Sequence, residues 1–452
     1  MSLEVIVLAA GMGKRMHSAL PKVLHRLAGR PLLAHVLDAA RALAPQRIFV
    51  VHGHGGDAVK AAFDGAALEW IEQTEQLGSG HAVLQALPHV DPGAEVLVLY
   101  GDVPLVRAET LRRLADAARG GLAILTAELP DPSGYGRIVR GTGGCVARIV
   151  EQKDATDAEL ALHEVNAGFL AAACSRLGAW LAQVHNRNAQ REYYLTDVIE
   201  IAAREGTAVA AVRAADWHEV AGVNSRGELA DLERAYQARQ AARLLQSGVA
   251  LADPARVDVR GGLECGRDVW IDVNCVFEGE VSLGDGVKIG PNCVLKNTRV
   301  AAASEILAFS MLEDAEIGAR CRVGPYARLR PGTSLAEDVH IGNFVEVKAS
   351  RFGAGSKANH LSYVGDSEIG ARVNIGAGTI TCNYDGALKH RTVVEDDCFI
   401  GSDATLVAPV RIARGSYIGA GSTISEDTPP GQLTVARARQ VSVPDWKPPK
   451  KN

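Results

Sequence analysis

The chain has 452 residues, which is long enough for two or three domains that each bury a core of their own. Its 48 basic and 53 acidic side chains leave a formal charge of −5, which argues against nucleic acid as the main partner. No window approaches the ~20 apolar residues of a membrane span, and the start MSLEVIVLAAG lacks the basic leader of a signal peptide, so a cytoplasmic protein is expected.

The eight cysteines form no CxxC pair and lie near no histidine cluster. This pattern predicts neither a zinc site nor a disulfide framework. The cysteines are expected to be small buried residues in a reducing compartment.

Short apolar runs alternate with helical stretches from residue 3 to about 226. The runs LEVIVLAA, RIFVVHG, EVLVLYGD and LAILTAEL predict buried parallel strands, and PLLAHVLDAARAL and ETLRRLADAAR are typical of helices between them. The alternation predicts an α/β domain over residues 1–226, with a doubly wound, Rossmann-like sheet whose ligand groups follow the carboxyl ends of its strands.

A glycine-rich turn follows the first strand of this domain. The segment LAAGMGKRM covers residues 8–16, and Pro21-Lys22 comes shortly after it. Backbone N–H groups of such a turn close around a phosphate, and Arg15 and Lys22 add positive charge. The spacing fits neither the P-loop nor the GxGxxG dinucleotide motif, so strand, turn, arginine and lysine together carry the prediction of a phosphate site.

A helical segment is expected at residues 227–249. Its sequence, GELADLERAYQARQAARLLQSGV, is rich in alanine, leucine, glutamate and arginine, and Ser247-Gly248 is a plausible stop. We expect a solvent-exposed helical arm between two globular units.

An aliphatic or aromatic residue recurs at every sixth position after about residue 270. The runs are Ile271, Phe277, Leu283, Ile289 and Leu295; Ile317, Val323, Leu329, Leu335, Ile341 and Val347; and Val394, Ile400, Leu406, Ile412, Ile418 and Ile424. A strict period of six matches neither a helix nor a half-buried strand. It predicts a parallel β-helix over residues 250–435, followed by a tail at 436–452.

Glycine often follows the repeated residue, as in Ile289-Gly290, Ile317-Gly318 and Ile341-Gly342. The expected reason is that glycine tolerates the backbone angles of a corner.

The six-residue period breaks several times between Val347 and Ile400, where polar residues gather around His360. The residues near it in sequence, or one coil earlier, are Arg330, Lys348, Tyr363, Asn374, Asn383 and Tyr384. A lone histidine more often has a structural role. The polar residues near His360 are what favour a catalytic role for it. Histidine suits a general base near neutral pH.

The motif LAAGxGxRM followed by PK resembles the signature of sugar-nucleotide pyrophosphorylases, which join a sugar 1-phosphate to a nucleoside triphosphate. Lys14 stands where such enzymes usually have threonine. The resemblance implies that UTP and the nucleotide sugar are bound by Leu8, Ala9, Ala10, Gly11, Lys22, Gln73, Gly78, Ser79, Tyr100, Gly101, Asp102, Gly136, Glu151, Asn166 and Asn224.

Within that set, the resemblance implies three groups of roles. Gln73, Gly78 and Ser79 would read uracil. Gly136, Glu151 and Asn166 would hold an acetamido sugar. Asp102 and Asn224 would bind Mg²⁺, which prefers oxygen ligands. The sugar phosphate is already anionic and needs no side-chain nucleophile, so Arg15 and Lys22 would act as catalytic residues by neutralising charge.

The whole chain resembles the bifunctional bacterial uridylyltransferase–acetyltransferases that make UDP-N-acetylglucosamine, a precursor of peptidoglycan and lipopolysaccharide. The resemblance implies that His360 is the base for acetyl transfer from acetyl-CoA to glucosamine 1-phosphate and that Glu346 orients it. The sugar phosphate would be held by Arg330, Lys348, Tyr363 and Asn374. Acetyl-CoA would be bound by Ala377, Asn383, Tyr384, Ser402, Ala420 and Arg437. The resemblance also implies a homotrimer.

Two rival interpretations remain open. One is a pyrophosphorylase whose β-helix serves only assembly or regulation, as in enzymes that make ADP-glucose. The other is a non-enzymatic scaffold, like the translation-factor exchange subunits that combine the same two folds. The polar cluster around His360 disfavours the first, and the retention of Arg15, Lys22, Asp102 and Asn224 disfavours the second.

Overall fold

The computed structural model describes residues 2–11 and 13–448, apart from the side chain of Lys14. The chain divides into two compact units, one ending at Tyr236 and one beginning at Gln237. The last residues of the expected tail, 449–452, lie outside the described part. No helix in the described ranges combines the length and apolarity needed to cross a membrane.

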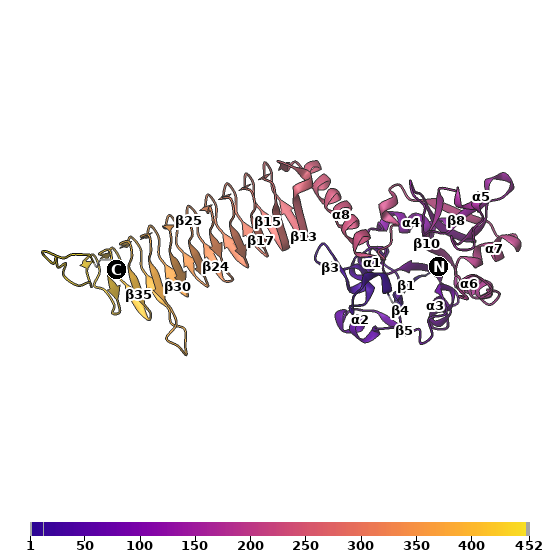
Figure 1. Ribbon diagram of the computed structural model, residues 1–452, viewed down its shortest axis with the longest axis horizontal. Helices are drawn as coiled ribbons and strands as arrows, with labels where there is room; N and C mark the ends of the chain where they lie inside the picture. Colours follow the sequence, from indigo (N-terminus) through magenta and orange to yellow (C-terminus); the bar gives the residue numbers. More distant parts are fainter. Residues whose placement is uncertain (1, 12, 449–452) are drawn as a thin grey trace. The chain divides into compact units, whose positions relative to one another are not determined.

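The first unit is built on a mixed sheet with the strand order β11-β7-β10-β6-β1-β4-β5, to which β8 and β9 are joined beside β10 (Figure 1). Its strands are β1 (Leu3–Leu8), β4 (Arg47–His52), β5 (Glu69–Glu72), β6 (Glu95–Tyr100), β7 (Leu122–Glu128), β8 (Arg137–Arg140), β9 (Val146–Val150), β10 (Glu164–Ala173) and β11 (Val209–Arg213). Its main helices are α1 (Leu32–Arg41), α2 (Gly56–Ala62), α3 (Ser79–Ala86), α4 (Ala108–Ala117), α5 (Asp157–Leu160), α6 (Cys174–Leu181) and α7 (Asp197–Arg204).

Helices cover both faces of this sheet. In β1, Val5 and Val7 pack in a core with α1 and α4, whereas Ile6 and Leu8 pack in another with α3, α6 and α7. From Val5 to Leu8 the strand is therefore apolar at every position, as expected for a strand buried on both faces. The four strands and two helices expected here are present, and the doubly wound prediction is confirmed. The long strand β10, which runs antiparallel to β6 and β7, was not predicted.

Helix α8 (Arg226–Gln246) follows the first sheet, close to the residues expected for the helical arm. The composition predicted a helix exposed to solvent on all sides, but α8 is buried at some positions. Leu232 is buried in a core with Met16 and Leu27 of the first unit. Leu244 is buried in the core of the second unit. Exposed arginine and glutamate side chains elsewhere on the helix concealed these buried positions in the sequence.

The second unit is a stack of coils in which every strand pairs in parallel with its equivalent in the next coil (Figure 1). One sheet contains β12 (Ala250–Leu251), β14 (Trp270–Ile271), β16 (Lys288–Ile289), β19 (Glu305–Ile306), β22 (Arg322–Val323), β25 (His340–Asn343), β28 (Lys357–His360), β31 (Asn374–Ile375), β34 (Phe399–Ile400), β37 (Tyr417–Ile418) and β39 (Leu433–Thr434).

The other two sides of each coil form one continuous sheet. It contains β13 (Val257–Cys265), β15 (Cys275–Leu283), β17 (Val294–Lys296), β18 (Arg299–Val300), β20 (Met311–Glu313), β21 (Ala315–Ile317), β23 (Arg328–Leu329), β24 (Thr333–Leu335), β26 (Glu346–Lys348), β27 (Arg351–Phe352), β29 (Tyr363–Gly365), β30 (Ser367–Ile369), β32 (Ile380–Cys382), β33 (Thr392–Val394), β35 (Thr405–Val407), β36 (Val410–Ile412) and β38 (Thr423–Ile424).

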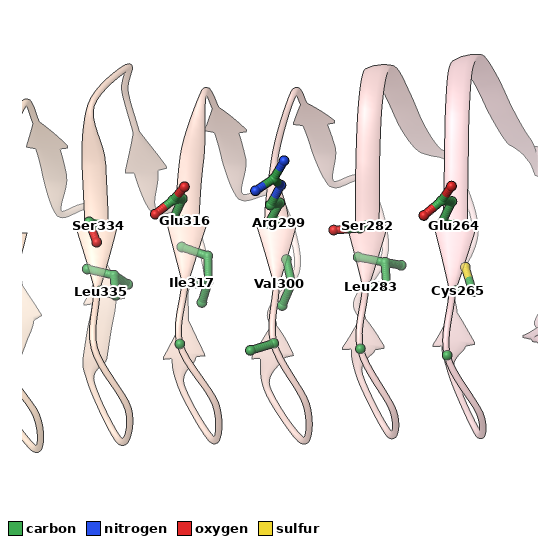
Figure 2. Close-up of a pocket in the computed structure, with 14 residues that line it drawn as sticks. Glu264, Cys265, Ser282, Leu283, Arg299, Val300, Glu316, Ile317, Ser334 and Leu335 are labelled. Carbon is green, nitrogen blue, oxygen red and sulfur yellow. The ribbon is translucent and has the colours of Figure 1, made fainter.

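The repeated residues of all three runs point into the centre of the coils, where each is at most 3 % exposed. Figure 2 shows the register along one side, where Leu283, Val300, Ile317 and Leu335 repeat at one position of successive coils. Burying each such side chain contributes about 1.5–3 kcal/mol to stability. The prediction of a parallel β-helix from the period of six is confirmed.

The reason expected for the glycines holds for Gly324, which follows Val323 and has a φ of 102°, but it is wrong for the pairs named above. Gly318 and Gly342 do not have a positive φ, and a Cβ at Gly342 would lie 1.9 Å from the carbonyl oxygen of Asn359 in the next coil. Glycine is needed because adjacent backbones approach closely. The left-handed corner positions are instead held largely by other residues, such as Phe309, Tyr326 and Phe344.

The cysteines are all free thiols. Cys174, Cys275, Cys293, Cys321 and Cys398 are buried, as expected. Cys145 is exposed, and Cys265 and Cys382 are partly so, which departs from that expectation.

Candidate functional site

The phosphate-binding turn and the candidate metal ligand lie together at the carboxyl edge of the first sheet. Strands β1 and β6 pair in parallel with Leu8 opposite Tyr100, so the segments that follow them begin side by side. Gly101 donates its backbone N–H to the carbonyl of Leu8 at 2.9 Å. Ala9 and Ala10 are buried, whereas Gly11 is exposed. The turn therefore presents its glycine end to solvent.

Lys22 lies between two oxygen acceptors from distant parts of the chain. Its ammonium forms an ion pair with Asp102, and Nζ donates to Oδ1 of Asn224 at 3.2 Å. The backbone N–H of Val223 donates to the carbonyl of Asp102 at 2.9 Å and so ties the two segments together. A carboxylate and an amide oxygen thus converge on one cationic position, which is the donor set that a magnesium ion uses.

The predicted uracil-reading loop has a fixed amide at its centre. Gln73 is 4 % exposed, and its Nε2 lies 3.1 Å from the carbonyl of Gly78 and 3.0 Å from Nδ1 of His81. Both amide N–H groups are therefore directed at the protein, and Oε1 is left to accept a hydrogen bond. Ser79 accepts from the backbone N–H of Leu195 at 3.1 Å. The sequence did not single out His81.

The predicted sugar-binding residues meet on the antiparallel side of the sheet. The backbone N–H of Asn166 donates to the carbonyl of Gly136 at 2.8 Å. A Cβ at Gly136 would lie 3.3 Å from Oε1 of Glu151, so the absence of a side chain leaves that carboxylate accessible. Burial raises the pKa of Glu151, and the hydroxyl of Thr196, which donates to Oε1 at 3.1 Å, counteracts the rise.

Tyr100 links these parts. Burial raises its pKa to about 12, with Ser79, Glu151 and Asp102 all close enough to affect it. A cavity of about 390 Å³ adjoins Glu151 and is lined also by Asp154 and Asp197. The structure thus brings the predicted nucleotide-binding residues to one edge of the sheet. Arg15 is exposed beside them, and the side chain of Lys14, whose effect the sequence left open, lies outside the described part.

The second candidate site lies on the β-helix, where one corner carries a column of chemically useful residues. Asn343 and His360 occupy equivalent positions in adjacent coils. Ala377, Ser402 and Ala420 continue the column, since Asp403 donates its N–H to the carbonyl of Ala377 and Gly421 donates to that of Ser402. Arg437 Nη1 donates to the carbonyl of Ala420 at 2.5 Å. Three predicted acetyl-CoA residues are thereby aligned with His360.

The backbone N–H of Ala377 donates to no acceptor among the described residues. This N–H is therefore available to donate to a negatively charged oxygen atom.

A cationic group occupies the neighbouring sheet. Arg330 and Lys348 lie one coil apart, and Nζ of Lys348 is 3.6 Å from the carboxylate of Asp366, to which Asn383 also donates. The sequence analysis missed Lys389. This residue lies close enough to Lys348 for the Lys348 side chain to lower the pKa of the Lys389 ammonium. Lys389 follows a loop that interrupts the repeat, so the period of six gave no signal for it.

His360 has a different partner from the one expected. Its Nδ1 lies 2.7 Å from Oδ1 of Asn343. The expected partner, Glu346, instead accepts from Nη1 of Arg330 at 2.8 Å and pairs in register with Tyr363. The physical reason is the length of one coil. Equivalent positions in these two coils are 17 residues apart, as Asn343 and His360 are. Glu346 is only 14 residues from His360, so it does not lie beside it.

Within one chain, Asn374 and Tyr384 do not join the cationic group formed by Arg330, Lys348 and Lys389. Asn374 belongs to the sheet that contains β28, whereas Lys348 and Tyr363 belong to the other sheet. Tyr384 is 60 % exposed, and its hydroxyl donates to the carbonyl of Gly386 in its own loop. A hollow of about 670 Å³ lies on earlier coils, along the row Glu264, Ser282, Arg299, Glu316 and Ser334, and contains none of the predicted residues (Figure 2).

Comparison with known proteins assigns both units. Residues 5–186 match the model of the MobA-like NTP transferase domain. Residues 263–352 match the GMPPB C-terminal domain, and residues 391–426 match the bacterial transferase hexapeptide.

Full-length relatives are numerous. Proteins named "Bifunctional protein GlmU" from Nitrosospira multiformis and Chromobacterium violaceum are each 59 % identical, over 99 % and 100 % of this chain and 98 % and 99 % of theirs. The protein of that name from Azoarcus sp. is 60 % identical over 99 % of this chain and 100 % of its own. The chain therefore belongs to the GlmU family of bifunctional transferases.

Proposed function

We infer that this chain makes UDP-N-acetylglucosamine in two steps. The second unit transfers the acetyl group of acetyl-CoA to glucosamine 1-phosphate, and the first unit transfers UMP from UTP to the resulting N-acetylglucosamine 1-phosphate with release of pyrophosphate. The observation that carries this inference is that each unit holds its own cluster of polar groups suited to one of the two reactions. The family relationship over the whole chain supports the same conclusion.

Uridylyl transfer depends on alignment and charge neutralisation. The sugar phosphate is anionic near neutral pH, so its oxygen attacks the α-phosphorus of UTP directly. Arg15 and Lys22 bring positive charge to the phosphates. Gln73 accepts the N3–H of uracil through Oε1, and Glu151 accepts hydroxyl groups of the sugar.

Asp102 and Asn224 would hold Mg²⁺. When bound, the ion would stabilise negative charge that develops on the phosphate oxygens. The convergence of their oxygens on the Lys22 ammonium supports this assignment. Lys22 would then turn its ammonium towards phosphate oxygens.

Acetyl transfer requires a base because the amine of glucosamine is protonated near neutral pH and an ammonium has no lone pair. His360 takes that proton, and the freed amine attacks the thioester carbonyl. The C–S bond then breaks as the amide forms, and coenzyme A leaves as a thiolate that takes up the second proton lost by the nitrogen. The N–H of Ala377 supports this step by facing the oxyanion. Arg330, Lys348 and Lys389 hold the sugar phosphate.

The acetyltransferase site is completed by a second copy of the chain, and the assembly is a trimer. The placement of Asn374 on a different sheet from Lys348 supports this proposal. So do the exposed stacked rings of Phe309, Tyr326 and Phe344, which are 47 %, 47 % and 56 % exposed. Both substrates and products are small polar metabolites, so we place the enzyme in the cytoplasm.

A pair of variants tests the two assignments. Asp102→Asn is expected to abolish pyrophosphate release from UTP while acetyl transfer continues. His360→Ala is expected to lower kcat for acetyl transfer about 10²–10⁴-fold while uridylyl transfer continues. Products would be identified by mass after incubation with glucosamine 1-phosphate, acetyl-CoA, UTP and Mg²⁺.

The same measurement separates the rival functions. A β-helix that serves only assembly predicts no acetylated product from the unaltered protein. A scaffold predicts neither product.

A further inference from the structure

His360 is an exposed side chain whose ring has one hydrogen-bond partner among the described residues. Nδ1 of His360 lies 2.7 Å from Oδ1 of Asn343. The two residues face each other in register across β25 and β28, so neighbouring coils hold them together. The backbone of His360 is fixed as well, since Oγ of Ser362 donates to its carbonyl at 2.8 Å.

We propose that Asn343 is a positioning residue that sets the tautomer and direction of the His360 ring. This inference rests on the proposed role of His360 as the base for acetyl transfer. A neutral imidazole carries one N–H, and the other nitrogen holds the lone pair. Because Oδ1 of Asn343 can only accept, it retains the proton on Nδ1 and leaves Nε2 free to take a proton from the substrate ammonium.

The neutral amide has a second consequence. A carboxylate at this position would also accept from Nδ1, but it would stabilise the imidazolium and keep the ring protonated to higher pH. The nearby carboxylate of Glu346 is engaged by Arg330 and lies beside Tyr363 rather than His360. Asn343 therefore orients the ring without favouring its charged, unreactive form.

Two substitutions at one position separate these effects. Asn343→Leu is nearly isosteric and removes the acceptor, so kcat for acetyl transfer is expected to fall about tenfold to a hundredfold, part of the 10²–10⁴ that a positioned base contributes. KM for acetyl-CoA and glucosamine 1-phosphate should change less than twofold, about the scatter of such measurements, because a residue that acts only through the His360 ring does not contribute to substrate binding. Asn343→Asp keeps the acceptor, so it should retain most of kcat while the acid limb of its pH profile moves up by about one unit.

Controls in the same protein distinguish the possible failures. Uridylyl transfer by the first unit should be unchanged in every variant, and circular dichroism should show an intact β-helix. If His360→Ala retains full acetyl transfer, the base assignment fails and this inference fails with it. If His360→Ala is inactive but Asn343→Leu keeps its kcat, or changes only KM, the base stands and the positioning role of Asn343 is overturned.

Discussion

Asp197 begins α7 and lines the cavity beside Glu151. Burial raises its pKa to about 6, and Glu200, Glu151 and Asp154 add to the rise because each places negative charge nearby. The folded protein therefore binds a proton at this carboxyl over a pH range, from about 4 to 6, in which the unfolded chain releases it. The resulting stabilisation is present at low pH and is lost as the pH rises through 6.

Asp197→Asn should remove this dependence. Above pH 7 we expect the variant to be more stable than the parent by roughly 1 kcal/mol, a value reduced for solvent screening of a partly exposed group. Below pH 4 the two proteins should unfold alike, since both then carry a neutral group. Thermal unfolding across pH 4–8 measures the difference. Equal unfolding temperatures at pH 8 would show that the carboxylate does not destabilise the folded protein and would contradict this prediction.

Residue identities were predictable where a short motif follows a predicted strand. Gly11 and Asp102 follow β1 and β6, and adjacent parallel strands necessarily bring such positions together. Asn343 was missed because its relation to His360 depends on the length of one coil, which only the three-dimensional register defines. Lys389 was missed because it lies after a loop that breaks the repeat.

At the scale of elements, the β-helix was readable because one inward residue per side must recur in every coil. The sequence did not reveal why glycine recurs. Close backbone approach and a positive φ both select glycine, so the two reasons cannot be distinguished from the sequence. Strand β10 escaped for another reason. Its run FLAAA is apolar and short, so its period does not distinguish a strand from a buried helix.

Gly318→Ala and Gly421→Ala separate the two reasons for glycine. A Cβ at Gly318 would lie 2.5 Å from backbone atoms of Ala336, so we expect a loss of about 3 kcal/mol. Gly421 has a φ of 68° and no neighbouring atom within 4 Å, so its loss should be about 1 kcal/mol from strain alone. Denaturant unfolding of the β-helix compares them, and equal losses would contradict the close-approach explanation.

At the scale of the whole molecule, the exposed ring stack offers a test of assembly. Tyr326 lies between Phe309 and Phe344, with ring centroids 4.9 and 5.2 Å away. Tyr326→Asp suits the positive φ at this position, so it should leave the coil folded while placing a charge in the proposed interface.

We expect this variant to sediment as a smaller species and to lose acetyl transfer while it retains uridylyl transfer. Val441→Asp changes a more exposed apolar residue outside the stack and should leave the assembly intact. An unchanged sedimentation coefficient for Tyr326→Asp would place the interface elsewhere.

Helix α8 restricts where the chain can be divided into separately expressed fragments. Glu233 accepts the backbone N–H of Ala28 at 2.6 Å, and Tyr236 packs edge-on against His35, so the first unit uses the helix up to that residue. The next residue, Gln237, already exchanges two hydrogen bonds with the backbone of Val259 in the second unit. A truncation that ends before Tyr236 or starts after Gln237 strips a packed group from one half, so independently expressed fragments should be divided at that peptide bond.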